Sequence, residues 1–87
     1  MSFTVTWVAE AESELASLWM SAADRESIRI AADRIESVLR GDPQSVGESR
    51  SSGRRLVIVP PLILTFRVLD ADRIVRVLNV RVDPRRQ

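Results

Sequence analysis

The side chains that could do chemistry in this 87-residue sequence are arginines, carboxylates and hydroxyls, because it contains no histidine, cysteine, tyrosine or lysine. All 13 basic residues are arginines, and a guanidinium binds phosphate or stabilises negative charge but does not take up a proton. Histidine, which is the usual proton shuttle near neutral pH and the usual ligand of transition metals, is absent. Ser-His-Asp and Cys-His sets, Schiff-base lysines and zinc sites are therefore excluded. We expect no metal, no cofactor and an activity that rests on charge.

The arginines are concentrated in the second half of the chain. Residues 1–40 contain four arginines and seven carboxylates, whereas residues 41–87 contain nine arginines and five carboxylates. A basic half of this kind suits a phosphate backbone or an acidic protein, and a compositional bias toward arginine is the alternative explanation. The candidates for binding a target are the arginines of the predicted strands, namely Arg54, Arg55, Arg67, Arg76 and Arg81.

The spacing of these arginines predicts how they are divided between the two faces of a sheet. Arg54 and Arg55 are adjacent, so only one of them can join a given face. The alternative for this pair is an ion pair with a glutamate at the start of the first helix. Arg76 and Arg81 are five residues apart on the last strand, which predicts opposite faces. Arg67 lies among outward positions and is the best single candidate for a contact surface.

Hydrophobic periodicity predicts the elements that must position these side chains. Apolar and polar residues alternate at the N-terminus, as in a half-buried strand, and the apolar residues then follow a helical spacing. Asp24 is placed to cap a second helix, which Gly41 and Pro43 end. We expect a strand over 3–8, helices over 10–22 and 25–40, a polar loop over 41–53, and strands over 54–59, 62–69 and 74–82.

Three conspicuous residues of these elements are assigned structural roles. Trp7 lies on the inward face of the first strand and Trp19 in the apolar stripe of the first helix, so we expect both in the core. Asn79 interrupts an apolar strand, and a buried amide bonded to backbone is the preferred explanation.

This order of elements predicts an α+β fold of β-α-α-β-β-β topology, in a single domain over residues 1–87. Short connections favour an antiparallel sheet with a helical hairpin packed on one face. The other face of the third strand is neither a core nor a clean solvent surface, which indicates a covering partner; tolerance of a few exposed apolar residues is the alternative. The inward residues of that strand are Leu62, Leu64, Phe66 and Val68, and the outward residues are Ile63, Thr65, Arg67 and Leu69.

The sequence shows no targeting segment. The N-terminus lacks the basic region and apolar core of a signal peptide. The longest apolar stretch, 56–64, contains two prolines and is too short to span a bilayer. Because there is no cysteine to form disulfides, we expect a protein of the reducing cytoplasm with no membrane contact.

Three stretches of the second half, taken with the length and the element order, form a recognisable pattern. They are Gly53-Arg54-Arg55-Leu56-Val57, Leu64-Thr65-Phe66-Arg67-Val68-Leu69-Asp70 and Val75-Arg76-Val77-Leu78-Asn79-Val80. With these stretches and the Asp42-Pro43 loop, nearly the whole chain resembles the RelE/ParE superfamily of bacterial toxins. Members are typically the growth-inhibiting toxin of a type II toxin–antitoxin pair, so the resemblance implies a cognate antitoxin as partner. It also implies either a homodimer of the chain or a hetero-oligomer of the chain with its antitoxin. The antitoxin-binding candidates are Ile63, Thr65, Arg67 and Leu69.

The superfamily divides by mechanism, and the resemblance favours a branch without catalysis. RelE-like members cleave messenger RNA on the ribosome, typically with an arginine in the third strand and a C-terminal tyrosine. The arginine position falls at Ile63, and the chain has no tyrosine. ParE-like members bind DNA gyrase, need no catalytic set and often keep a basic C-terminal segment, comparable with residues 81–86 here. We therefore favour a non-enzymatic, gyrase-directed toxin or one of unknown target; a ribonuclease and a non-toxic antitoxin-binding relative stay open.

Overall fold

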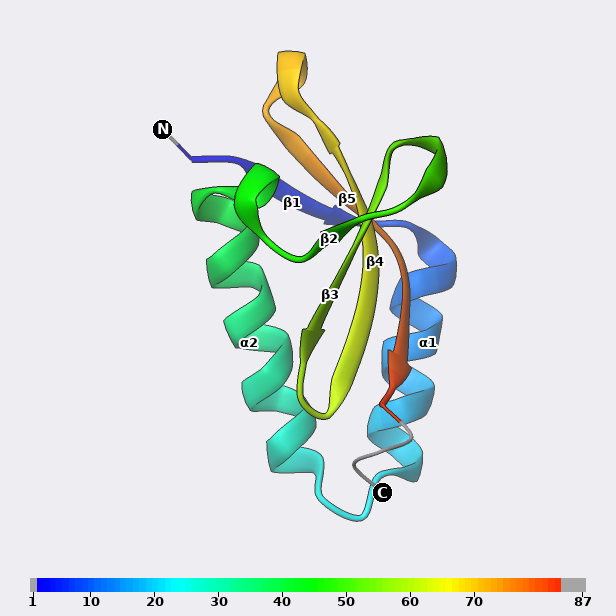
Figure 1. Cartoon of the computed structure of the whole chain (residues 1–87). Coiled ribbons are helices and arrows are strands. Elements are labelled where there is room, and N and C mark those ends of the chain that lie inside the picture. The colour runs from blue at the N-terminus through cyan, green and yellow to red at the C-terminus, as the bar shows by residue number, and fades with distance from the viewer. Residues whose placement is uncertain (1, 84–87) are drawn as a thin grey trace.

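The computed structural model describes residues 2–83, which form one sheet and two helices (Figure 1). Within these residues, neither helix has the length and apolar character needed to cross a membrane. The five strands are hydrogen-bonded in the order β1-β5-β4-β3-β2. The elements are β1 (Thr4–Trp7), α1 (Ala9–Ser21), α2 (Arg25–Gly41), β2 (Glu48–Ser49), β3 (Arg54–Val59), β4 (Leu62–Leu69) and β5 (Ile74–Val82), with short 3₁₀ turns at Pro43–Ser45, Ser51–Gly53 and Asp70–Asp72.

The predicted α+β fold is confirmed, with two differences in the sheet. Strands β2 to β5 pair antiparallel, as their short connections require. β1, however, pairs with β5 in parallel, with Thr4 opposite Ile74. Two helices and three strands lie between β1 and β5 along the chain, so no short turn sets the relative direction of these two strands. The additional strand β2 lies within the predicted loop, where two residues extend the edge of β3.

The ends of α2 follow the signals in the sequence closely. Asp24 is its N-cap, because the carboxylate Oδ1 accepts a hydrogen bond from the backbone N–H of Ser27 at 3.1 Å. At the other end Gly41 is the last helical residue and Asp42 the cap, one position later than predicted. Pro43 follows and is buried, so the chain turns away from the helix where the sequence indicated.

The core lies between the helices and one face of the sheet. Its centre is the even-numbered side of β4, where Leu62, Leu64 and Phe66 are fully buried as predicted. Trp7 packs against this core, but the same expectation for Trp19 was wrong, since 38% of its surface is exposed. At 3.6 residues per turn, position 19 lies about 80° around α1 from the buried Ala11, at the margin of the apolar stripe.

A bulge in β5 changes which of its residues share a face. Thr65 lies opposite Asn79, but the next residue of β4, Phe66, lies opposite Val77, so Leu78 is an extra residue in β5. Residues on either side of a bulge no longer alternate by their number in the chain. The prediction of opposite faces for Arg76 and Arg81 was therefore wrong: both lie opposite outward residues of β4, on the same face.

Candidate binding surface on the open face of the sheet

The helices leave one face of the sheet uncovered, and we call it the open face. It is the side of β3, β4 and β5 that carries the odd-numbered residues of β4. The predicted outward residues Ile63, Thr65, Arg67 and Leu69 all lie on it. Three of the four are partly exposed, and only Thr65 is buried, with 9% of its surface accessible.

Three arginines form a row across the open face. Arg67 of β4 lies opposite Arg54 of β3 on one side and opposite Arg76 of β5 on the other. The Cβ atoms of directly opposed residues are about 5 Å apart, so the three guanidiniums start from neighbouring positions. We call Arg54, Arg67 and Arg76 the arginine row. Like charges directly opposite each other destabilise a sheet, so this arrangement favours the binding of an anion.

The arginine row has no counterion within the described part of the chain. Arg50 lies beside it at the sheet edge, where its backbone N–H donates to the carbonyl of Arg54 at 2.7 Å. Arg50 is itself paired with Glu48 at 2.9 Å. Within residues 2–83, no carboxylate oxygen lies within 4.0 Å of a guanidinium nitrogen of the row. Among residues 2–83, therefore, no carboxylate compensates the positive charge of the row.

The middle arginine of the row is held by the turn before β3. Arg67 Nη2 donates a hydrogen bond to the carbonyl oxygen of Ser52 at 2.8 Å. Ser52 adopts a positive φ of 64°, a conformation uncommon for a residue with a side chain. The Nε of Arg67 is buried and has no partner among the described residues. Arg67 is therefore fixed in position but keeps an unused donor.

Arg81 belongs to the same face, two rows further along β5. It lies opposite Ile63 and is exposed, and within residues 2–83 no carboxylate pairs with it. Four of the five candidate arginines are thus brought together on the open face.

Arg55 is the candidate that the structure separates from the others. It lies opposite Phe66, on the helix side of the sheet, as the adjacency of the two arginines predicted. Its Nε donates to the carbonyl of Val46 at 3.0 Å and its Nη2 to that of Gly47 at 3.3 Å. Gly47 has a φ of +73°, and a Cβ there would overlap the carbonyl of Leu56. Arg55 thus holds a closely packed loop against β3 and pairs with no glutamate of α1.

A neutral polar row lies next to the arginine row. Thr65 lies opposite Asn79, and the Oδ1 of Asn79 is buried without a partner among the described residues. The predicted hydrogen bond between the side-chain amide of Asn79 and the backbone is therefore not made through this oxygen. The bulge beside Asn79 is stabilised from the helix side instead, because the N–H of Val80 donates to Glu14 Oε1 at 2.9 Å.

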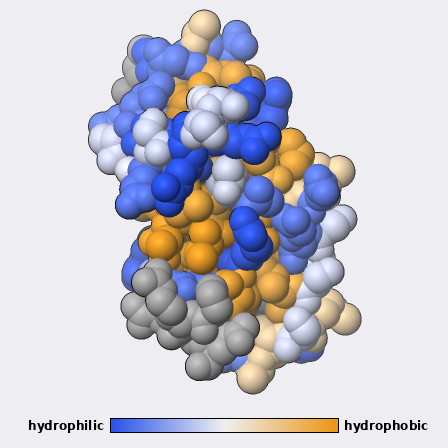
Figure 2. Space-filling model, turned by 45° about the vertical axis from the view of Figure 1, so that its right-hand side comes forward, coloured by the Kyte–Doolittle hydropathy of each residue, from blue (hydrophilic) through white to orange (hydrophobic). Residues whose placement is uncertain are grey.

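Aliphatic residues border these polar rows at both ends of the open face. Leu69 lies opposite Ile74 on one side of the arginine row, and Ile63 lies opposite Ile58 beyond the polar row. Ile58 is 42% exposed. In the view of Figure 2, apolar surface likewise emerges between hydrophilic side chains rather than as one uninterrupted patch. The open face therefore combines positive charge with accessible aliphatic surface.

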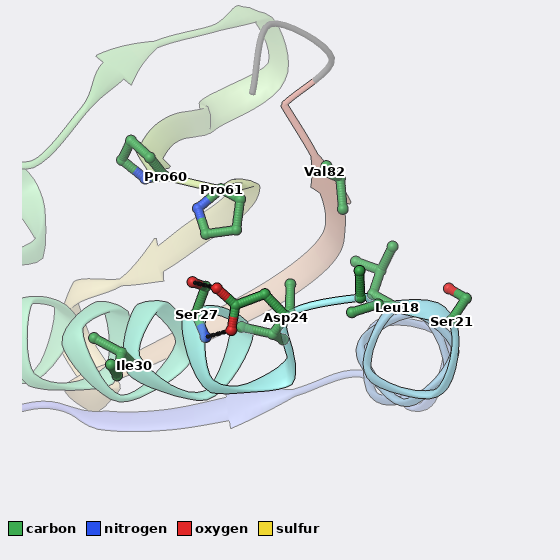
Figure 3. A pocket seen from close by; sticks show the side chains of 11 residues that line it. Leu18, Ser21, Asp24, Ser27, Ile30, Pro60, Pro61 and Val82 are labelled. Carbon is green, nitrogen blue, oxygen red and sulfur yellow. Dashed lines mark hydrogen bonds between the residues drawn. The ribbon is translucent and has the colours of Figure 1, made fainter. Parts of the chain in front are cut away.

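A separate hollow of about 800 Å³ lies at the end of the molecule where the helices are joined (Figure 3). It is lined by residues between Leu18 and Ile30 and, across from them, by Pro60, Pro61 and Val82. Its one carboxylate, Asp24, is already bonded twice to Ser27, which holds the pKa of that carboxyl below its usual range. The hollow therefore offers apolar surface without a free acid or base.

The open face can bind an anion through its guanidiniums. In the described part of the chain no cluster of three potential metal ligands occurs. Glu48 lies opposite Leu56 on the open face, and it is bonded to Arg50. Guanidiniums supply charge stabilisation but no general base.

Sequence reasoning missed two features of this surface. Neither the alignment of the three arginines into one row nor the polar pair Thr65–Asn79 was foreseen. Both depend on the register of strands and on the extra residue Leu78. From the sequence Arg54-Arg55 alone, it could not be predicted which residues of β4 lie opposite this pair. The sequence Leu78-Asn79 likewise did not indicate that one of its residues is extra.

Comparison with known proteins gives matches at the level of structure only. No protein-family model and no curated protein sequence matches the chain. The structure of the RelBE2 toxin–antitoxin complex from Mycobacterium tuberculosis matches with a TM-score of 0.79 and 20% identity over 94% of this chain and 99% of that one. The archaeal RelE–RelB complex from Pyrococcus horikoshii OT3 matches with a TM-score of 0.69 and 14% identity, over 98% and 99% of the two chains.

Two structures from P. aeruginosa complete the comparison. A chromosomal ParDE toxin–antitoxin system matches with a TM-score of 0.69 and 17% identity over 92% of this chain and 95% of that one. TrmO matches with a TM-score of 0.61 and 23% identity, over 91% of this chain but 33% of TrmO. The chain therefore has a RelE/ParE-like fold, which is the fold that the resemblance in the sequence implied. The match to part of TrmO shows that the fold alone does not define a function.

Proposed function

We propose that this chain is the toxin of a type II toxin–antitoxin pair, acting as a single domain over residues 1–87 that a cognate antitoxin neutralises. Three of its structural neighbours are toxin–antitoxin systems that match over nearly their whole length. The observation that carries the proposal is the arginine row, because a fold this small presents three aligned arginines without a counterion in residues 2–83. Such a surface is suited to a macromolecular partner of opposite charge.

The proposed mode of action is binding rather than catalysis. Arg54, Arg67, Arg76 and Arg81 can hold an anionic surface, but none of these guanidiniums can accept and return a proton. DNA gyrase is the proposed target, since a ParE-like toxin requires only a complementary surface. Ribosome-dependent cleavage of messenger RNA is the second candidate, and the alignment of arginines able to contact a phosphodiester backbone is the observation that favours it.

Induced expression of the intact chain in a bacterial host tests the proposal. We expect growth arrest that is relieved when the small reading frame beside this gene is expressed as well. Arrest with altered DNA supercoiling and intact transcripts supports the gyrase target, whereas transcripts cleaved within codons support the ribonuclease.

A matched pair of variants connects the arrest to the open face. Arg54→Gln combined with Arg76→Gln should abolish the arrest, whereas Arg34→Gln on the outer surface of α2 should leave it unchanged. Absence of arrest from the unmodified, well-expressed chain would instead indicate a non-toxic relative and overturn the proposal.

A further inference from the structure

We infer that the free chain forms a homodimer in which β1 pairs antiparallel with β1 of a second copy, so that the two sheets become one. This dimer goes beyond the proposed function, because it belongs to the free chain whatever the target is. Three features favour it: the unpaired backbone groups of β1, the contrast between the two edges of the sheet, and side chains that complement their own images across a two-fold axis.

The odd-numbered residues of the edge strand β1 turn their backbone groups away from the sheet. The N–H of Thr4 donates to the carbonyl of Arg73 at 2.9 Å, so the even-numbered residues of β1 bond to β5. The N–H and C=O of one strand residue point to the same side, so those of Val5 and Trp7 point to the outer edge. Within residues 2–83, no turn, helix or side chain bonds to these four groups.

The two edges of the sheet are protected to different degrees. Proteins block an exposed edge with a short strand, a charge or a proline. β2 has two residues, one of them the exposed Glu48. β1 has four residues and contains neither a charge nor a proline. Helix α2 occupies only its beginning, where the N–H of Phe3 donates to the carbonyl of Arg40 at 2.9 Å. The rest of the β1 edge is therefore available to a further strand.

The side chains of β1 complement their own images across a two-fold axis at Thr6. An antiparallel pair centred there places Val5 opposite Trp7 of the second copy, so that every free N–H meets a free C=O. Aromatic–β-branched pairs and Thr–Thr pairs are both favourable across strands. Val5 and Trp7 are partly exposed in the single chain, and Trp7 is already held by its bond to Glu36 at 3.1 Å. Pairing would therefore cover apolar surface without rearranging it.

The second copy would also extend the arginine row. Thr6 lies opposite Arg76, so it prolongs the row to the edge of the sheet. With Thr6 opposite its image, the rows of the two copies lie in line on one continuous open face. The nearest arginines of the two copies are three strand spacings apart, about 14 Å, which exceeds the screening length of about 8 Å at physiological ionic strength. Their repulsion is thus weak, and one long anionic partner can contact both rows.

Sedimentation equilibrium of the purified intact chain measures this association. Because an edge of four residues buries little surface, we expect a dissociation constant of about 100 µM. Thr6→Lys places like charges opposite each other at the axis and should weaken the dimer at least about tenfold. The control Ser49→Lys adds the same charge to the other edge strand, β2, and should leave the dimer unchanged. Circular dichroism verifies that both variants are folded.

Cysteine cross-linking tests the register of the pair. The chain has no cysteine, so Thr6→Cys and Thr4→Cys each introduce a single thiol, on the same face of β1. In the dimer the two copies of residue 6 have Cα atoms about 5 Å apart, within reach of a disulfide. The two copies of residue 4 are offset by about 14 Å along the strands. Oxidation with copper phenanthroline should therefore link Thr6→Cys into a dimer and leave Thr4→Cys monomeric.

Several results would overturn the dimer while the proposed function stands. They are an unmodified chain that stays monomeric up to about 500 µM, equal cross-linking of the two cysteine variants, and a dimer that Ser49→Lys disrupts but Thr6→Lys does not. If the unmodified chain is monomeric and Thr6→Lys weakens binding of the product of the adjacent small reading frame, the edge receives a strand of another protein, and the inference is likewise overturned. If Thr6→Lys fails to fold, the cross-linking pair decides.

Discussion

Helix α2 and the arginine row of the open face both present arginines to solvent, but within residues 2–83 only the helix pairs such arginines with carboxylates. On α2, Arg29 lies 2.7 Å from Glu26 and 2.9 Å from Asp33. On the open face, Arg54 and Arg76 flank another arginine and, in residues 2–83, have no acid within 4.0 Å. The difference teaches that an arginine count says little about a binding surface until the neighbours of each guanidinium are known.

The origin of this difference lies in the two kinds of secondary structure. A helix brings residues three and four apart into contact, so its acids and arginines are paired locally. A sheet row is assembled from distant parts of the chain, and here each of three strands contributes an arginine to one row. Exposed pairs on a helix contribute little to stability, so the main consequence concerns partners: Arg29 and Arg40 of α2 are paired within the helix, whereas the arginine row has no such pair among residues 2–83.

Reversing the charge of the open face should produce the largest effect. Arg54→Glu combined with Arg76→Glu places two carboxylates beside Arg67, so the row would be neutralised from within. We expect at least a roughly 1,000-fold loss of antitoxin affinity, because like charges across an interface cost several kcal/mol. Calorimetric titration measures this loss.

The corresponding reversal on α2 is its control. Arg29→Glu combined with Arg40→Glu should leave the antitoxin affinity unchanged while it removes the ion pairs with Glu26, Asp33 and Glu36. An equal loss of affinity in both variants would show that net charge, and not the row, determines binding.

The salt dependence of the complex should distinguish the same two regions. Uncompensated arginines gain a counterion on binding, so the affinity should fall by about tenfold between 0.05 and 0.5 M salt, as expected for screened charge pairs. Arg54→Gln/Arg76→Gln should flatten this dependence, and Arg34→Gln should preserve it. A slope unchanged by the open-face variant would contradict the role of the row.

Removing one arginine from the arginine row and one from α2 should change the stability of the free chain in opposite directions. Arg76→Gln removes one repulsion from the row and should raise the free energy of unfolding by about 0.5 kcal/mol, the magnitude of a cross-strand pair. Arg29→Gln should lower it, because this arginine bonds two carboxylates. Urea denaturation of the two variants provides the test, and destabilisation by Arg76→Gln would mean that the row is satisfied within the free chain.

Acid should act on the start of α2 and leave the arginine row unchanged. Hydrogen bonding and charge from Arg29 lower the pKa of Glu26 from its ordinary value of 4.5, and hydrogen bonds from Ser27 lower that of Asp24 from 3.8. A lowered carboxyl pKa contributes its full stability at pH values above the ordinary pKa, and that contribution is lost as the pH falls through the lowered pKa of the folded state.

The first turn of α2 should therefore fray as the pH falls below the ordinary pKa values of these two carboxyls, because its cap and first ion pair depend on them. The arginines of the open face do not titrate in this range. Cα chemical shifts between pH 6 and pH 3 report both regions. Acid-induced shifts confined to β4 and β5 would contradict this account.

The local features of this protein were predictable from its sequence. The apolar stripe and the cap at Asp24 located α2, and period-two alternation placed Ile63 and Leu69 outward on β4. These signals are local, because a helix turn or a strand repeat is decided by residues a few positions apart.

The features that make the candidate site were beyond sequence reasoning. The parallel pairing of β1 with β5, the register of Arg54 with Arg67 and the extra residue Leu78 are tertiary properties. A single bulge reverses every inference from residue spacing beyond it, as Arg76 and Arg81 show. The exposure of Trp19 has a similar cause, since the width of the buried stripe of α1 is set by the sheet against which it packs.

Nuclear magnetic resonance of the intact chain, titrated with the product of the adjacent small reading frame, tests the open face most directly. Arginine Nε–H signals and the methyl signals of Ile63 and Leu69 report this face, and the signals of Arg29 and Ile30 report the exposed side of α2. We predict that binding shifts the signals of the arginine row and of the two β4 methyl groups while those of α2 stay in place. Shifts confined to α2, with the arginine row unchanged, would contradict the account.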